Sequence, residues 1–185
     1  MLSDGRTLRV DAEEIARAGL APGEPVRSDL IMRLMARDDY WRARETAVRL
    51  LAARPRSTEE LRARFRRDGV ADAQAQAVLA DLAACGYLDD LAFARAWIES
   101  RLGRNPCGSA RLRGELRQRG VALAVIEQAI REAYGEEGTS VGEERDAAAV
   151  VERRSRAYAS LPPEARARRL ARFLERRGFA PGTIV

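Results

Sequence analysis

The sequence predicts a mainly α-helical protein made of tandem three-helix, helix-turn-helix-like repeats, with a small, partly β appendage at its N-terminus. Two observations predict this fold. Apolar residues make up 46% of the chain but aromatic residues only 5%, and the apolar content is mainly Ala, Leu and Val, which favours helices over sheets. A basic amphipathic segment also recurs three times, so the 185 residues read as a few small domains rather than one large one.

The first part of the chain, residues 1–39, differs from the rest. Thr7–Val10 is predicted to form a short strand, Glu13–Ala18 one or two helical turns, and Gly23–Val26 a turn into an extended piece. A helix is expected to open near Leu30. We therefore expect residues 1–39 to form an α/β extension, and its role stays open.

The recurring segment is LRARFRRDGV at 61–70, LRGELRQRGV at 112–121 and LARFLERRGF at 170–179. In each copy a glycine follows a leucine by eight residues and precedes an apolar residue. This is the pattern of a helix that ends at a left-handed glycine, with a hydrophobic contact just beyond it. The three glycines are Gly69, Gly120 and Gly178.

Each copy is flanked in a similar way. An apolar helix is predicted before it, at 47–54, 93–102 and 148–161, and a third helix follows the first two copies, at 73–85 and 122–134. The predicted repeats are 40–89, 90–136 and 143–185, and the last helix of the third is short. The segment GEEGTSVG, 135–142, is the candidate for a flexible linker.

Ser57 and Glu60 form a capping box at the start of the first copy, and Leu61 and Phe65 follow as a buried stripe. The adjacent carboxylates Asp89 and Asp90 stand where the next helix begins, just before Phe93. They fit a helix cap. A metal or acid/base site is the alternative, but no further carboxylates form a recognisable set with them. We favour the cap.

Composition excludes several chemistries. Every basic residue is arginine, and the chain has no histidine and no lysine. This excludes His-containing metal sites and Schiff-base lysines, and removes the usual general base. Two cysteines, Cys85 and Cys107, are too few for a disulfide scaffold or a Cys-based zinc site. No long apolar run or signal sequence is present. We expect a cytoplasmic protein that is not an enzyme, with no cofactor, metal or membrane partner.

Positive charge is concentrated at one end. The net charge is +5, and residues 145–185 carry 10 arginines and 4 acids. This predicts a surface that binds a protein or nucleic-acid polyanion. The candidate residues are Arg153, Arg154, Arg156, Arg166, Arg168, Arg169, Arg172, Arg176 and Arg177. Second candidates in the preceding repeat are Arg111, Arg113, Arg117 and Arg119, for which a solvated face with internal ion pairs is the favoured interpretation.

Four aromatic residues, Trp41, Trp97, Tyr134 and Tyr158, lie on apolar helix faces, and we expect them in cores rather than stacked on bases. A DNA-binding regulator of the helix-turn-helix type remains an alternative. The helix at 122–130, ALAVIEQAI, is however mostly apolar and better suited to burial than to base reading.

The motifs together resemble the RecX regulatory family. The residues that carry the resemblance are Arg56, Ser57, Glu60 and Leu61; Gly86, Tyr87, Asp89, Asp90, Phe93 and Ala94; and Gly108, Arg111, Leu112, Glu115 and Leu116. It covers about residues 40–185 and is strongest over 50–121. It implies an elongated, curved array of three-helix repeats.

The resemblance also implies a function. RecX proteins bind the RecA recombinase filament, lie along its groove and damp its ATPase and strand-exchange activities in DNA repair and recombination. Some also bind single- or double-stranded DNA. We therefore expect a monomeric regulator whose partners are the RecA filament and, weakly and through charge, DNA.

Overall fold

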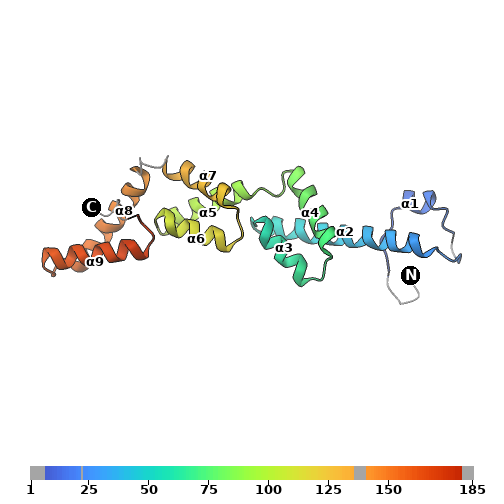
Figure 1. Cartoon of the computed structure of the whole chain (residues 1–185), viewed down its shortest axis with the longest axis horizontal. Coiled ribbons are helices and arrows are strands. Elements are labelled where there is room, and N and C mark those ends of the chain that lie inside the picture. Colours follow the sequence, from blue (N-terminus) through green and yellow to red (C-terminus); the bar gives the residue numbers. More distant parts are fainter. Residues whose placement is uncertain (1–6, 22, 136–140, 181–185) are drawn as a thin grey trace. The chain divides into compact units, whose positions relative to one another are not determined.

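The computed structural model describes residues 7–21, 23–135 and 141–180, and every regular element within these ranges is a helix (Figure 1). They fall into two compact units. The first contains the residues up to Arg56 together with Leu61–Leu88, and the second contains Ser57–Glu60 together with the residues from Asp89 onward. The mainly α prediction is confirmed.

The first unit contains α1 (Ala12–Arg17), α2 (Ser28–Ala53), most of α3 (Thr58–Arg67) and α4 (Asp72–Ala84). Its core packs two alanines of α2 against residues of α3 and α4 and against Leu88, which follows α4. The buried members are Ala43, Ala47, Leu61, Phe65, Ala75, Val78, Leu79, Leu82 and Leu88. The stripe predicted at Leu61 and Phe65 is therefore confirmed. Helix α2 runs without a break across the predicted boundary between residues 39 and 40.

The short strand predicted at Thr7–Val10 is wrong, since no described residue forms a strand. A lone segment of this length has no partner strand to supply its hydrogen bonds, and a sheet needs several strands to be stable. The segment instead lies against α2, where the amide of Arg9 donates to the Asp38 carboxylate at 3.3 Å.

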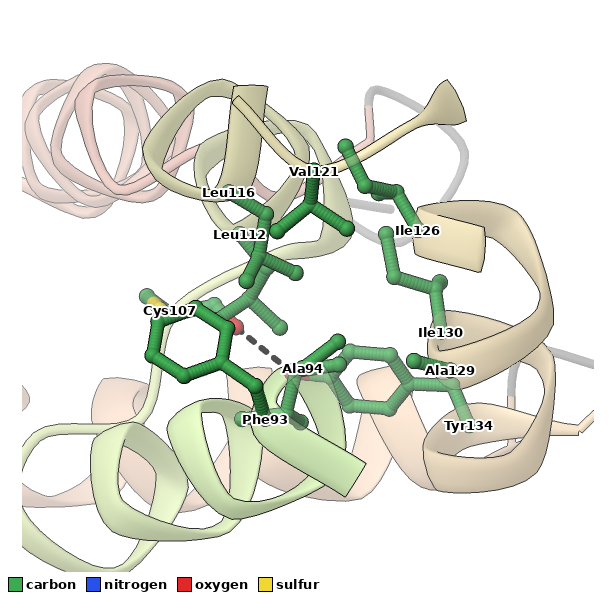
Figure 2. Close-up of a cluster of buried hydrophobic side chains, with 11 residues drawn as sticks. Phe93, Ala94, Cys107, Leu112, Leu116, Val121, Ile126, Ala129, Ile130 and Tyr134 are labelled. Carbon is green, nitrogen blue, oxygen red and sulfur yellow. Dashed lines mark hydrogen bonds between the residues drawn. The ribbon is translucent and has the colours of Figure 1, made fainter. Parts of the chain in front are cut away.

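The second repeat, in the second unit, contains α5 (Asp90–Arg104), α6 (Ser109–Gln118) and α7 (Leu123–Tyr134). Figure 2 shows how α5 contributes Phe93, α6 contributes Leu112 and Leu116, and α7 contributes Ile126 to one buried cluster. The Tyr134 side chain lies in this core, and its hydroxyl donates a hydrogen bond to the Cys107 carbonyl at 2.6 Å. Phe93 and Tyr134 are therefore core residues, which confirms the expectation for Tyr134.

The third repeat contains α8 (Val141–Ser155), the 3₁₀ helix η1 (Arg156–Tyr158) and α9 (Pro163–Arg176). Its buried cluster is formed by Ala147, Val150, Leu174 and Phe179. Residues 136–140 of the predicted linker lie outside the described residues, and α8 already begins at Val141. The short last helix expected for this repeat falls on residues 181–185, which are also outside the described residues.

The three glycines that end the recurring segments adopt the left-handed conformation, with φ of 73° at Gly69, 73° at Gly120 and 80° at Gly178. The amide just beyond each glycine donates to the carbonyl five residues earlier, at 3.0 to 3.2 Å. This is the Schellman pattern. The predicted helix ends are confirmed.

The expectation for Trp41 is wrong, because its side chain is 46% exposed. The reason lies in the register of α2, where Ala43 and Ala47 are the residues buried in the core. Trp41 precedes Ala43 by two residues, which turns it to another face of the helix. Trp97 and Tyr158 are half-buried.

Within the described part of the chain, no helix is long and apolar enough to cross a membrane.

Candidate functional site

The adjacent carboxylates Asp89 and Asp90 cap two different helices. Asp89 is the N-cap of α5, and its Oδ1 accepts hydrogen bonds from the amides of Leu91 at 2.8 Å and Ala92 at 3.0 Å. Asp90 instead accepts from the amide of Thr58, the first residue of α3, at 2.8 Å. The capping role predicted for Asp89 is confirmed. The partner of Asp90, the amide of Thr58, was not predicted from the sequence.

Glu143 performs the same task for α6. It is only 4% exposed, and its Oε1 accepts from the amide of Ser109 at 3.0 Å. Helix α6 needs this carboxylate because its N-cap residue is Gly108, which has no side chain, and its first turn has no acidic residue. A carboxylate from α8 therefore satisfies a backbone N–H that α6 cannot satisfy itself. In the sequence, the signal for the contact between Glu143 and Ser109 is that Gly108 has no side chain to cap α6.

A second set of contacts places the C-terminal end of a recurring helix against the N-terminal end of another. The Ser57 hydroxyl donates to the Arg119 carbonyl at 2.6 Å and accepts from the Glu60 amide at 3.1 Å. The Glu60 carboxylate pairs with the Arg119 guanidinium. The N-cap half of the predicted capping box is thus present, and the structure adds the pairing of Glu60 with Arg119.

The corresponding contact between the second and third repeats includes two backbone–backbone hydrogen bonds. The Gly108 amide donates to the Arg177 carbonyl at 3.0 Å, and the Ala110 amide donates to the Gly178 carbonyl at 3.2 Å. A Cβ atom added at Gly178 would lie 2.5 Å from the Arg111 nitrogen. The glycine is therefore required both for its positive φ and for this close approach.

The candidate arginines of the second repeat differ among themselves. Arg111 binds Glu115 at 3.0 Å, and Arg113 binds Glu127 at 2.6 Å. The hydrogen bond from Arg113 lowers the pKa of the Glu127 carboxyl. Arg117 is exposed on α6.

The candidate arginines of the third repeat lie on three elements. Arg153 and Arg154 are in the last turn of α8, Arg156 is in η1, and Arg177 is the C-cap of α9. Helix α9 itself carries Arg166, Arg168, Arg169, Arg172 and Arg176. Among the described residues, only Arg168 of this set has a carboxylate within ion-pair distance, with 3.6 Å between its Nη1 and the exposed Glu164.

Two of these arginines are held by an aromatic ring. The guanidinium carbons of Arg154 and Arg177 lie over Phe173, at 4.9 and 5.0 Å from the ring centroid. Arg154 also lies 5.8 Å from the centre of Tyr158, and Arg177 Nη1 donates to the Pro106 carbonyl at 2.9 Å. Cation–π contacts orient a guanidinium without neutralising it.

Arg177 is the centre of a group of like charges. Burial lowers its pKa from the ordinary arginine value, and the nearby cations Arg111, Arg153 and Arg154 add to this decrease. We call Arg111, Arg153, Arg154 and Arg177 the Arg177 cluster. The sequence had placed Arg111 in a separate set from the other three, and the close packing of Arg111 on Gly178 brings them together.

Among the described residues, no group of three or more acidic, histidine or cysteine side chains is arranged to hold a metal ion. The Arg177 cluster lies at the contact between the second and third repeats, and the rings of Phe173 and Tyr158 contact two of its guanidinium groups.

The three repeats match the family models for the first, second and third three-helix domains of RecX, over residues 43–82, 89–130 and 143–185. "Regulatory protein RecX" of Thermobifida fusca is 39% identical over 146 residues, which cover 78% of this chain and 76% of that protein. The chain belongs to the RecX family. Another RecX, from Thermus thermophilus, is 41% identical over 140 residues, covering 75% of this chain and 84% of the relative.

Solved RecX structures share the fold. A crystal structure of regulatory protein RecX superposes with a TM-score of 0.77 at 18% identity, covering 94% of this chain and 83% of that one. The structure of RecX from Lactobacillus salivarius gives a TM-score of 0.73 at 15% identity, with 80% and 92% covered. The resemblance drawn from the sequence motifs is confirmed.

Proposed function

We propose that this RecX-family chain binds the RecA recombinase filament on DNA and inhibits its ATPase and strand-exchange activities. It acts as a monomeric regulator in the cytoplasm, without a catalytic centre or a cofactor. The observation that carries the proposal is the match of all three repeats to the three RecX domains, in order. The relatives bear the name regulatory protein.

The arginines of the third repeat support the proposal that this repeat contacts the RecA filament. A recombinase filament on DNA is a long polyanion with protein walls, and repeats joined in one chain can each bind weakly and still give useful avidity. Arginine suits such a partner because its planar fork binds carboxylate or phosphate through two parallel hydrogen bonds. Arg169 and Arg172 are exposed on α9, beside Arg168.

The test is a RecA ATPase assay on single-stranded DNA, with the purified chain titrated in at several salt concentrations. A triple variant carrying Arg168→Glu, Arg169→Glu and Arg172→Glu should require a higher concentration for half-inhibition at physiological salt. A matched triple in the first unit, Arg17→Glu, Arg33→Glu and Arg49→Glu, makes the same charge change at exposed positions and should inhibit like the parent.

Two outcomes would contradict the proposal. If the parent chain does not inhibit RecA at all, the assignment to RecA fails. If both triples inhibit like the parent, the third repeat is not the contact. Steep loss of inhibition with salt would support a charge-driven contact.

The alternative, a DNA-binding regulator without a recombinase partner, would need a helix free to read bases. Helix α7, which follows the glycine turn, buries Ile126, Ala129, Ile130 and Tyr134 in the core of its own repeat. DNA binding by the purified chain without any change in RecA ATPase would favour this alternative.

A further inference from the structure

The second helices of the three repeats, α3, α6 and α9, meet end to end in contacts of one kind. The C-terminal end of α6 lies on the N-terminal end of α3, where the Arg119 carbonyl accepts from the Ser57 hydroxyl at 2.6 Å. The C-terminal end of α9 lies on the N-terminal end of α6, where the Gly178 carbonyl accepts from the Ala110 amide at 3.2 Å. Each contact joins two different surfaces. A series of such contacts leaves the C-terminal end of its first member, α3, without a helix to lie on.

The C-terminal end of α3 is built like the other two but is open. Gly69 has the same φ, 73°, as Gly120. A Cβ atom added at Gly120 would lie 2.3 Å from the Glu59 Cβ, whereas one added at Gly69 meets nothing within 4 Å. We call residues 67–70 the Gly69 end. It has the shape of a docking end whose partner helix is missing.

The Gly69 end also has unused hydrogen-bond acceptors. The last carbonyls of an α-helix have no partner inside the helix. At the other two ends these carbonyls accept from the Ser57 hydroxyl and from the Gly108 and Ala110 amides. No described residue donates a hydrogen bond to the carbonyl of Asp68 or Gly69, and both residues are exposed. The end therefore favours a ligand that presents several donors, such as the first turn of a helix.

The second helices of this chain offer no free N-terminal end for that role, even in a second copy. Those of α3 and α6 are already covered by the ends of α6 and α9. Helix α9 begins with Pro162 and Pro163, and proline has no N–H to donate. The helix that completes the Gly69 end therefore belongs to a different protein.

Asp68 indicates the chemistry of that helix. It precedes its glycine, as Arg119 and Arg177 precede theirs. The Arg119 guanidinium pairs with Glu60 in the first turn of α3. Asp68 would instead repel an acid at that place and accept from a donor. Arg64 binds Asp68 Oδ2 at 2.7 Å, which leaves Oδ1 for this donor.

We propose that the Gly69 end docks on the N-terminal end of an α-helix in the RecA subunits of the filament. The helix that fits has a small or hydroxyl-bearing N-cap residue, as at Gly108 and Ser57, and a hydrogen-bond donor opposite Asp68. For the identity of the partner this inference rests on the proposed function. It adds a protein–protein contact in the first repeat to the contact proposed for the third.

The experiment measures binding of the full chain to RecA filaments assembled on immobilised oligothymidylate, by biolayer interferometry with a non-hydrolysable ATP analogue. Bare oligothymidylate is measured in parallel. Gly69→Asn should bind the filament about tenfold more weakly, because its side chain blocks the close approach and removes about two hydrogen bonds. Asparagine tolerates the left-handed conformation, so the fold is kept. Binding to the bare oligonucleotide should not change.

A matched variant provides the control. Gly19, at the end of α1, also has a left-handed φ, 62°, and an added Cβ there also meets nothing within 4 Å. Gly19→Asn therefore makes the same substitution in the first unit at a glycine that has no counterpart in the other repeats. It should bind the filament within about twofold of the parent chain.

A second variant leaves the glycine intact. Asp68→Arg places a cation opposite the donor of the partner helix and should weaken filament binding about fivefold. Asp39→Arg, at an exposed position on α2, makes the same charge change and should not weaken it. Comparing these two variants removes any general effect of added positive charge on attraction to the filament.

Several results would overturn the inference while leaving the proposed function in place. They are parent-like filament binding by both Gly69→Asn and Asp68→Arg, equal losses in these variants and their controls, or a loss on bare oligothymidylate as large as that on the filament. Self-association of the parent chain in sedimentation velocity that Gly69→Asn abolishes would assign the end to a second copy instead. A parent chain that binds RecA-coated and bare oligothymidylate equally would overturn both the inference and the proposed RecA contact.

Discussion

The second and third repeats differ in the partners of several of their arginines. In the second repeat, arginines are paired with carboxylates across helices: Arg95 binds Glu132 through two hydrogen bonds of 2.6 and 2.8 Å, and Arg113 binds Glu127 through two of 2.6 and 2.9 Å. In the third repeat, Arg154 and Arg177 lie over Phe173 instead. Arginine content alone therefore does not distinguish a structural surface from a binding one.

The two repeats also differ in their cores. The second buries residues from all three of its helices in one cluster, whereas the described buried cluster of the third is limited to Ala147, Val150, Leu174 and Phe179. The third repeat is also tied to the second through Gly108, Ser109 and Gly178. The second repeat is thus suited to act as a scaffold, and the third depends more on its contact with the second.

The largest expected effect contrasts these cores. Leu112→Ala removes a fully buried side chain from the second repeat and should lower the free energy of unfolding by about 4 kcal/mol. Leu174→Ala in the third repeat should cost about 2 kcal/mol, because fewer buried neighbours surround the cavity and it collapses more easily. Urea unfolding followed by circular dichroism measures both. A cost at Leu174 equal to that at Leu112 would contradict the contrast.

The next effect compares two glycines with the same backbone conformation. At Gly69 an added Cβ meets nothing within 4 Å, so Gly69→Ala incurs only the left-handed strain, about 1 kcal/mol. At Gly178 the added atom also collides with Arg111, so Gly178→Ala should cost about 3 kcal/mol. Thermal melting of the two variants compares them directly. Equal destabilisation would mean that the close contact at Gly178 relaxes without cost.

The glycines also illustrate what sequence can and cannot predict. Their left-handed turns follow from local pattern, since an amphipathic helix, a glycine and an apolar residue define the motif within ten positions. The partner of Asp90 lies 32 residues away at Thr58, and that of Glu143 lies 34 away at Ser109. Such pairs depend on how helices pack, which no local pattern encodes. The proximity of Arg111 to Arg177 could not be predicted from the sequence for the same reason.

A smaller effect tests the link between the second and third repeats. Glu143→Ala leaves the Ser109 amide without its acceptor and should cost about 1 kcal/mol. Hydrogen exchange at the Ser109 amide should become faster, while amides in the core of α7 keep their protection. Glu152→Ala, an exposed position on the same helix, serves as the control. Unchanged exchange at Ser109 would show that another group satisfies this amide.

The smallest effect is a titration within the second repeat. The hydrogen bonds from Arg95 lower the pKa of the Glu132 carboxyl from its ordinary value of 4.5 to about 2. Because the folded-state pKa is depressed, the ion pair contributes its full stability above about pH 4.5 and loses it as the pH falls toward 2. Carbon-13 NMR of the Glu132 carboxyl should show this low pKa, and Arg95→Ala should return it toward the ordinary value. Arg131→Ala should move it much less, since Arg131 acts only through its charge. If Glu132 titrated normally in the parent chain, Arg95 would not be paired with it in solution, and the contrast between Arg95, which binds a carboxylate, and Arg154 and Arg177, which lie over Phe173, would lose its clearest example.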